Sequence, residues 1–229
     1  MSKKIAIAID GPAGAGKSTA ARMAAEKLGI IYIDTGAMYR AVALDTIRKG
    51  IDTRDKEKVS QLVGEINVSI ELTKAGQVIF LGNEDVKHLI RTPEVSIGSS
   101  NVAAVPEVRK RMVDIQRGIA AANSVVMDGR DIGTWVLPDA DLKIFLTASV
   151  EERAKRRYSE LIGKGNCTAS IEEVEADIRY RDFNDTTREY APLKAADDAK
   201  IIDSTGKTID EVVQMILDEV NKINGLKVE

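Results

Sequence analysis

The chain has 229 residues, with 33 Lys or Arg, 36 Asp or Glu and a single cysteine, so its formal net charge is −3. This length suits one domain with insertions, and a lone cysteine excludes an internal disulfide, which fits a reducing compartment. The slightly acidic balance argues against a protein that grips long nucleic acid, and no apolar run has the length of a membrane span or a signal peptide, so we expect a cytoplasmic protein.

The first elements in chain order alternate between short apolar strands and helices. Residues 5–9 (IAIAI) form a β-branched apolar run that predicts a buried parallel strand, and residues 30–33 predict a second one. Between them, Lys17–Leu28 is rich in helix-forming residues and ends at Gly29, a residue type favoured just after a helix. Residues 35–49 have helical spacing and also stop at a glycine.

The segment 51–100 departs from this alternation. Residues 68–72 and 78–81 resemble strands and flank residues 74–76 (KAG). This pattern predicts an antiparallel hairpin inserted into an α/β arrangement.

The second half of the chain returns to alternating strands and helices. The expected strands are apolar runs at residues 124–127, 142–146 and 200–202. Four helices are expected: Pro106–Ala122, residues 149–162, residues 170–183, and a last helix with an apolar face from 209 to 223. Residues 163–166 (GKGN) join the second of these helices to the third. Ser170 with Glu173, and Thr208 with Glu211, form capping-box patterns. Five strands alternating with helices imply an α/β fold with a five-stranded parallel sheet flanked by helices on both faces.

A glycine-rich segment follows the first strand. Residues 11–18 read GPAGAGKS, which matches the phosphate-binding pattern G-x-x-x-x-G-K-[ST] between a strand and a helix. Such a loop points backbone N–H groups into one concavity at a helix N-terminus. Lys17 can reach the β- and γ-phosphates of a nucleotide, and the Ser18 hydroxyl can ligate Mg²⁺. The expected ATP-binding residues here are Gly11, Pro12, Ala13, Gly14, Ala15, Gly16, Lys17, Ser18 and, as a weaker candidate, Thr19.

The glycine-rich segment leaves two questions open. A turn that merely starts a helix would show the same glycines, and the pattern does not identify the acceptor of a phosphoryl group. Residues 34–40 (DTGAMYR) and 128–131 (DGRD) each follow a predicted strand, so we expect them at the same edge of the sheet as the glycine-rich segment. Arg130 and Asp131 should project into this crevice, and Asp128 can lie near Mg²⁺ or its water shell. Taken alone, the second segment could also be a plain strand-end turn.

Several segments, in this order and at these intervals, resemble the bacterial cytidylate kinases, a branch of the nucleoside-monophosphate kinases. Besides the segments above, they are residues 90–95 (IRTPEV), 99–109 (SSNVAAVPEVR) and 181–188 (RDFNDTTR). The resemblance implies a single P-loop kinase domain over residues 1–229, in which 51–100 forms a monophosphate-binding lobe and 151–168 a short helical lid. It also implies transfer of the γ-phosphoryl group of ATP to CMP or dCMP, with Mg²⁺ as the cofactor.

The resemblance further implies roles on the acceptor side. Thr35 would line the acceptor site, and Arg40 would grip the acceptor phosphate through two parallel hydrogen bonds, although a solvated helix residue is the alternative. The resemblance also places Ser100, Arg109 and Asp131 around the cytosine, where the carboxylate of Asp131 can accept from the amino group of the base. Uracil has an oxygen in place of this amino group, so two acceptors would face each other without a proton. This mismatch should disfavour UMP by about 1–3 kcal/mol. The other implied acceptor residues are Gly129, Arg130, Arg181, Asp185 and Arg188.

Two sets of arginines can also be interpreted as surface residues without a role in binding. Arg181, Asp185 and Arg188 would share one face of a helix, and a ladder of ion pairs on the protein surface would show the same spacing. Residues 151–157 (EERAKRR) place Arg153, Arg156 and Arg157 on one face, as a charged solvent-facing helix would. The resemblance implies a lid in which Arg153 stacks on the adenine and Arg157 contacts the phosphates.

We expect catalysis by positioning and charge compensation, without a general base. The residues expected to act in this way are Lys17, Arg40, Arg130, Arg157 and Arg188. Two other functions stay open: a related kinase that uses UMP or AMP, and a non-enzymatic nucleotide-binding switch. We expect ATP and CMP or dCMP as ligands, no nucleic-acid polymer, no membrane partner and a monomeric protein.

Overall fold

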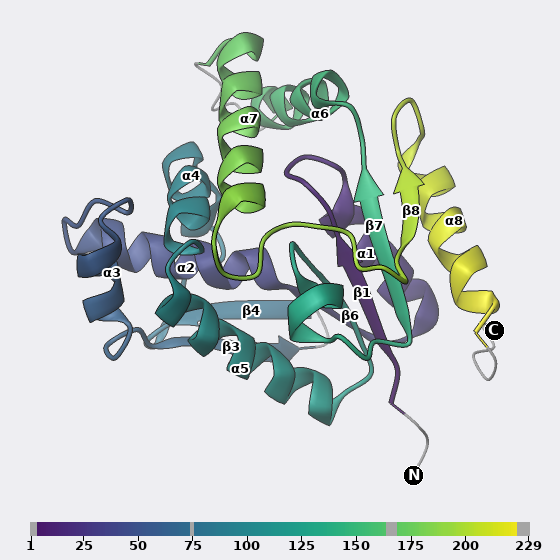
Figure 1. The fold of residues 1–229 in the computed structure, drawn as a ribbon, viewed down its shortest axis with the longest axis horizontal. Coiled ribbons are helices and arrows are strands. Elements are labelled where there is room, and N and C mark those ends of the chain that lie inside the picture. The colour runs from purple at the N-terminus through teal and green to yellow at the C-terminus, as the bar shows by residue number, and fades with distance from the viewer. Residues whose placement is uncertain (1–3, 74–75, 164–168, 224–229) are drawn as a thin grey trace.

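The structure, a computed structural model, describes residues 4–73, 76–163 and 169–223. At its centre is a five-stranded sheet with the strand order β2-β6-β1-β7-β8 (Figure 1). The strands are β1 (Ala6–Asp10), β2 (Ile31–Asp34), β6 (Val125–Gly129), β7 (Leu142–Thr147) and β8 (Lys200–Asp203). All four neighbouring pairs are parallel, which confirms the prediction of an α/β fold with a five-stranded parallel sheet.

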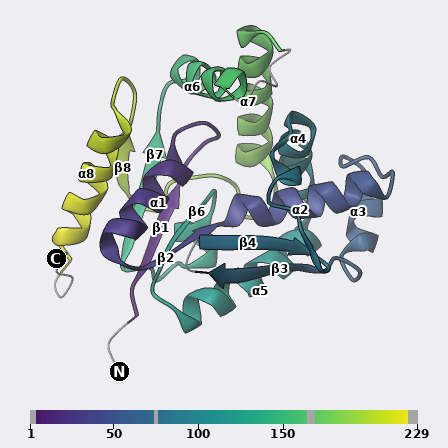
Figure 2. The same ribbon diagram turned by 180° about the vertical axis from the view of Figure 1, so that it is seen from behind.

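Helices cover both faces of this sheet, because successive side chains of a strand point to opposite faces and both sets are apolar here. Ile7 and Ile9 of β1 pack in one apolar cluster with α1 (Lys17–Leu28) and α8 (Ile209–Asn221). These two helices lie behind the sheet in Figure 1 and in front of it in Figure 2. Ala8 faces the opposite cluster, which includes residues of α5 (Pro106–Ala122) and of the π-helical turn η2 (Ile132–Val136).

The carboxyl ends of three neighbouring strands meet at one edge of the sheet. The register pairs Asp10 of β1 with Gly129 of β6, and Asp34 of β2 with Asp128 of β6. The three segments that leave these ends are therefore neighbours, as the sequence predicts: the glycine-rich loop of residues 11–16, the start of α2 (Thr35–Arg48) and residues 130–131.

The segment 51–100 contains the predicted antiparallel hairpin. Strands β3 (Val68–Thr73) and β4 (Gly76–Leu81) pair antiparallel, and β5 (Glu84–Asp85) adds a third strand. The prediction is confirmed, although residues 74 and 75 of its expected turn lie outside the described residues.

This segment and the two residues that follow it also contain helices that the sequence analysis missed. They are α3 (Lys56–Leu62), the short 3-10 helix η1 (Leu89–Arg91) and α4 (Pro93–Val102). Together with α2 and the hairpin they enclose a second apolar core, which includes the fully buried side chains of Met38, Val59 and Val102.

The side chain of Gln77 on β4 ties the hairpin to the central sheet. Its Oε1 accepts a hydrogen bond from the backbone N of Asp34 at 2.8 Å, and its Nε2 donates to the backbone O of Asp34 at 3.1 Å. Because β2 is the outermost strand of the sheet, these bonds satisfy main-chain groups that no strand of that sheet reaches. The amide thus fixes the corner between β2 and α2.

Helices α6 (Val150–Gly163) and α7 (Ile171–Thr187) form a pair above the carboxyl edge of the sheet (Figure 1). They pack through a small apolar cluster that contains Ala154, Leu161 and Val174. The capping boxes predicted at α7 and α8 are both present. The expected loop residues 164–166 and the cysteine at 167 lie outside the described residues. Among the helices of the described part, none is both long enough and apolar enough to cross a bilayer.

Candidate functional site

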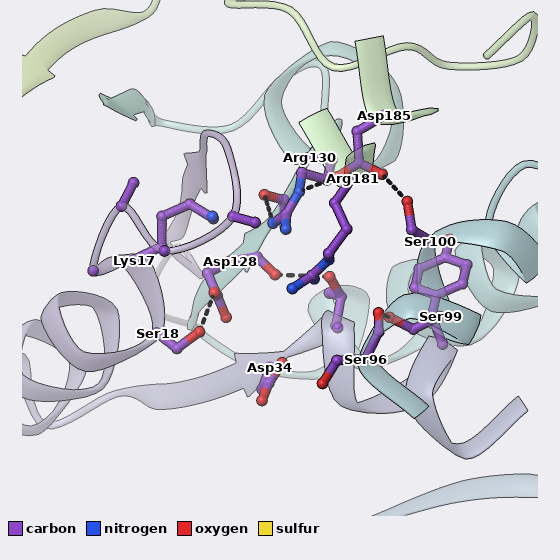
Figure 3. Close-up of a pocket in the computed structure, with 18 of the residues that line it drawn as sticks. Lys17, Ser18, Asp34, Ser96, Ser99, Ser100, Asp128, Arg130, Arg181 and Asp185 are labelled. Atoms are coloured by element: carbon purple, nitrogen blue, oxygen red, sulfur yellow. Dashed lines mark hydrogen bonds and ion pairs between the residues drawn. The ribbon is translucent and has the colours of Figure 1, made fainter. Parts of the chain in front are cut away.

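A cavity of about 500 Å³ opens at the carboxyl edge of the sheet (Figure 3). Its walls come from the glycine-rich loop, the start of α2, α4, the turn after β6, and helices α6 and α7. Ten of the lining side chains are Lys or Arg, whereas five are Asp or Glu. Since the whole chain carries a net charge of −3, this local excess of cations suits an anionic ligand.

The predicted site residues converge on this cavity. All of them line it except Gly11, Pro12 and Arg153. Gly11 has a φ of +147°, and a Cβ on it would lie 1.9 Å from the backbone O of Leu146 in β7. No other residue type fits there, so Gly11 shapes the loop from behind the cavity.

Lys17 lies at the start of α1 and is buried. Its Nζ donates to the backbone O of Pro12 at 2.7 Å. Burial and the nearby guanidinium of Arg130 hold the pKa of this amine well below its usual value. A bound polyphosphate would supply the counter-charge that favours the charged form.

Ser18 and Asp128 meet at the foot of the loop (Figure 3). Ser18 Oγ donates to Asp128 Oδ2 at 2.8 Å, and the hydroxyl of Tyr32 donates to Asp128 Oδ1 at 2.9 Å. Burial, together with the carboxylate of Asp34, raises the pKa of Asp128 to about 6. The sequence analysis missed Tyr32, which looks like an ordinary aromatic residue of a buried strand.

This pair of oxygen groups fits Mg²⁺, which proteins usually hold through one or two such ligands plus the phosphates of a substrate. Within the described part of the chain, no group of three or more His, Cys, Asp or Glu side chains could hold a metal ion. An ion at Ser18 and Asp128 would therefore depend on a bound nucleotide for its remaining ligands.

Arg40 and Arg130 line the same cavity as Lys17. Arg40 Nη2 lies 2.7 Å from Asp34 Oδ2, and Oδ1 of the same carboxylate accepts from the backbone N of Ala37 at the start of α2. Arg130 Nε lies 2.7 Å from Oδ2 of Asp185 on α7. Carboxylates at the end of β2 and on α7 thus hold both arginines in the cavity that the glycine-rich loop lines.

Arg181 extends from α7 into the middle of the cavity (Figure 3). In the part of the chain that the structure describes, its buried Nε has no hydrogen-bond partner. Burial and the positive charge of Arg130, followed by those of Arg40 and Arg157, lower its pKa to about 10. Four guanidinium groups therefore repel one another around one region, which is the arrangement expected where phosphoryl oxygens bind.

The far end of the cavity contains the residues that the resemblance places around the base. The guanidinium of Arg109 forms an ion pair with the Asp131 carboxylate, and both side chains are buried. Arg109 also lies over the ring of Tyr39, 5.1 Å from its centroid. Arg188 Nη2 is 3.6 Å from Asp131 Oδ1, so Arg188 lies at this end rather than among the four guanidinium groups around Arg181.

Asp185 lies between Arg130 and Arg188, with Arg188 Nη1 3.9 Å from its Oδ1. It accepts hydrogen bonds from Arg130 and from Ser100 Oγ, the latter at 3.1 Å. Burial alone would raise its pKa, but Arg130, Arg188 and Arg181 hold it below the usual value. The predicted shared helix face is only partly formed, because α7 ends at Thr187 and Arg188 follows as its capping residue.

Arg153 is not where the resemblance implies. Its side chain is buried beneath the glycine-rich loop, where Nη1 donates to the backbone O of Ala13 at 2.9 Å and to Asp182 Oδ2 at 2.6 Å. A Cβ on Gly14 would lie 3.1 Å from the Cβ of Arg153, so the loop packs directly on this residue. The expected stacking of Arg153 on an adenine does not fit this position, and α6 directs Arg156 and Arg157 to the cavity instead.

The sequence analysis also missed the residues that close the cavity beside Arg156. They are Ser204, Lys207, Ile209 and Val212, from the loop after β8 and the first turn of α8. Arg156 donates to Ser204 Oγ at 2.9 Å and to the backbone O of Ser204 at 2.6 Å. No local motif marks these residues, because they reach the cavity only through the position of β8 beside β7.

Comparisons with known proteins agree with this arrangement. The sequence model of a family described as "Cytidylate kinase" matches residues 7–222. A cytidylate kinase of Caldicellulosiruptor saccharolyticus is 50% identical over 226 residues, which cover 99% of this chain and 100% of that protein. One of Pelotomaculum thermopropionicum is 52% identical over 216 residues, covering 94% and 95% of the two chains. A solved structure of an uncharacterized protein from Eubacterium ventriosum has the same fold, with a TM-score of 0.53 at 15% identity over 96% of this chain and 99% of that one.

Proposed function

The chain belongs to the cytidylate kinase family and is therefore an ATP-dependent kinase of CMP or dCMP. On this basis we propose which residues of the cavity bind ATP and which bind the monophosphate. The observation that supports this assignment is that cations from different parts of the fold line one cavity. Lys17 lies at the start of α1, directly after the glycine-rich loop, whereas Arg40, Arg130 and Arg181 come from α2, the turn after β6 and α7.

We place ATP at the end of the cavity that contains the glycine-rich loop. Lys17 contacts the β- and γ-phosphates, and the backbone N–H groups at the start of α1 favour their negative charge. The adenine lies beside Arg156, Lys207 and Ile209, whose side chains line the cavity next to the loop. Arg153 then supports the loop from below instead of touching the base.

We place the monophosphate at the opposite end. Arg40 and Arg130 bind its phosphate, and Arg181 with Asp185 lies near its ribose and phosphate. Asp131 accepts from the amino group of cytosine, while Arg109 and Arg188, which lie beside this carboxylate, donate to the acceptors of the base. Ser100 and Thr35 complete the walls.

In the reaction, an oxygen of the acceptor phosphate attacks the γ-phosphorus in line with the leaving group. The new P–O bond forms as the bond to the bridging oxygen of ADP breaks, and the electron pair stays on ADP. A phosphate monoester has a second pKa of about 6, so this nucleophile is already ionised and needs no general base. Lys17, Arg130, Arg157 and Arg181 offset the charge on the transferred group. Mg²⁺ held near Ser18 and Asp128 would supply further neutralisation of the phosphate oxygens.

A substrate panel tests this division. ADP formation is measured with ATP, Mg²⁺ and each of CMP, dCMP, UMP and AMP. We expect kcat/KM for CMP to exceed that for UMP by about ten- to a hundredfold, from the unpaired oxygen of uracil facing Asp131. Equal turnover of UMP and CMP would contradict the role of Asp131, and ATP binding without ADP formation would favour the switch alternative. A cytoplasmic location and a monomeric state stay predictions.

Two of the three arginines of α6 allow a paired test. Arg156→Ala should raise the KM for ATP about tenfold with little change for CMP, because it removes one lining side chain at the adenine end. Arg153→Ala should mainly lower the free energy of unfolding, since it leaves Asp182 without its buried partner. Steady-state kinetics and urea denaturation of both variants distinguish the positions. A larger rise in the KM for ATP with Arg153→Ala than with Arg156→Ala would restore the stacking role of Arg153.

A further inference from the structure

Asp10 is a buried carboxylate that the proposed mechanism does not use. It is the last residue of β1 and directly precedes the glycine-rich loop. Its Oδ1 accepts a hydrogen bond from the backbone N of Ile132 at 2.8 Å, and its Oδ2 accepts from the backbone N of Gly133 at 2.7 Å. One carboxylate thus holds two successive main-chain N–H groups of a segment more than a hundred residues away in sequence.

These two N–H groups belong to the first residues of η2, the turn that begins immediately after Asp131. The backbone O of Asp131 accepts two of the hydrogen bonds of this turn, from Trp135 N at 2.8 Å and from Val136 N at 3.1 Å. The main chain of Asp131 is therefore tied to a turn whose start is fixed by Asp10. Asp10 itself is absent from the cavity lining, so any effect on a ligand passes through this turn.

The contact is close and excludes solvent. Asp10 is 4% exposed, and a Cβ on Gly133 would lie 3.4 Å from its Oδ2 and 3.1 Å from the side chain of Lys143. Burial raises the pKa of Asp10 to about 7, against the effect of the two backbone hydrogen bonds and of Lys17. A carboxyl group buried at this cost needs its hydrogen-bond partners in place.

We propose that Asp10 is a positioning residue for recognition of the acceptor base, because it fixes Asp131 relative to the glycine-rich loop. The same residue ends the strand that leads into the ATP-binding loop, so it sets the placement of one nucleotide's base against the other's phosphates. This inference rests on the proposed role of Asp131 in the proposed function.

The test is Asp10→Asn, which keeps the shape of the side chain but can accept only one of the two N–H groups. The kcat/KM for CMP should fall about tenfold, mainly through KM, because one of the two buried hydrogen bonds of this side chain is lost. The KM for ATP should change less than about twofold. The preference for CMP over UMP should fall together with the rise in the KM for CMP. An unchanged KM for CMP and an unchanged preference in a folded Asp10→Asn protein would overturn the proposal.

The matched control is Asp141→Asn. Asp141 Oδ2 accepts from the backbone N of Ala6 at 3.0 Å, at the other end of the same strand. This variant should lower the melting temperature but keep the wild-type preference for CMP. A loss of preference as large as that of Asp10→Asn would show that general weakening of β1 is the cause, and would overturn the proposal.

A double-mutant cycle separates positioning from a merely structural role. If Asp10 acts through Asp131, Asp10→Asn should have no further effect on the CMP preference in an Asp131→Ala protein, whereas additive effects would contradict the proposal.

Should Asp10→Asn not fold, Gly133→Ala disturbs the same contact from the other side and should shift the preference in the same direction; no shift would overturn the proposal. If the wild-type protein shows no preference for CMP, the proposed role of Asp131 is wrong. If the wild-type protein prefers CMP and the Asp10→Asn and Gly133→Ala variants keep the same preference, only the inference about Asp10 is wrong.

Discussion

Lys17→Met is expected to lower kcat by about two to three orders of magnitude, with the KM for CMP changed by less than about threefold. The amine is buried at the cavity next to the glycine-rich loop, and removing it takes away a cation at the oxygens where charge develops during transfer. Because burial and Arg130 disfavour the charged amine in the nucleotide-free protein, methionine at this position should not lower the free energy of unfolding. Steady-state kinetics with both substrates, together with urea denaturation, measure the two effects.

Lys27→Met is the matched control for this variant. Lys27 is an exposed residue in the last turn of the same helix, so its replacement removes an equal charge far from the cavity. It should leave kcat within about twofold of the wild type. A similar loss of kcat in both variants, or none in Lys17→Met, would contradict the assignment of Lys17 to the phosphates.

Asp131→Ala is expected to lower kcat/KM for CMP by about a hundredfold and to remove the preference for CMP over UMP. It should also lower the free energy of unfolding by about 3–5 kcal/mol, because Arg109 is left as a buried charge without its main partner. The milder variant Asp131→Asn keeps the size of the side chain. Its amide can donate to the oxygen of uracil, so the ratio of UMP to CMP turnover should rise.

The substrate panel and urea denaturation check both variants. Asp198→Asn serves as the control, since Asp198 is an exposed carboxylate paired with Lys143 at 2.9 Å outside the cavity. It should change neither the nucleotide preference nor the stability to a large extent. A CMP preference that survives in Asp131→Ala would remove Asp131 from base recognition.

The elements that could be predicted from the sequence are those with a local physical signature. The run IAIAI of β1 is apolar on both faces because a central parallel strand is buried on both. The glycine-rich loop and the capping box of Ser170 and Glu173 depend on residues only a few positions apart. In each case a short stretch of residues carries the pattern, although the strands that bury β1 on its two sides, β6 and β7, lie more than a hundred positions away.

Helix α4 shows why other elements could not be predicted. Its sequence, PEVSIGSSNV, contains glycine and several serines, which have low intrinsic helix propensity. It is stabilised by Thr92, which accepts from the N of Val95 at its start, and by burial of one face in the apolar core that includes α2. Ser100 reaches the cavity only because this helix forms.

Individual side chains of the site were harder still. The spacing of Arg153, Arg156 and Arg157 places them on one face of α6, but only the packing of the glycine-rich loop decides which of them is buried. Asp10, Tyr32 and Gln77 make their decisive contacts with residues 43 to 123 positions away. Their roles follow from the topology, which no short pattern contains.

The contact of Gln77 with Asp34 has a consequence for self-association. A strand at the rim of a sheet with free main-chain groups is a template on which another molecule can add a strand. On the open side of β2, the amide of Gln77 occupies both groups of Asp34. The inserted hairpin therefore shields the main-chain groups of Asp34, at the rim of the sheet, from pairing with a strand of another molecule.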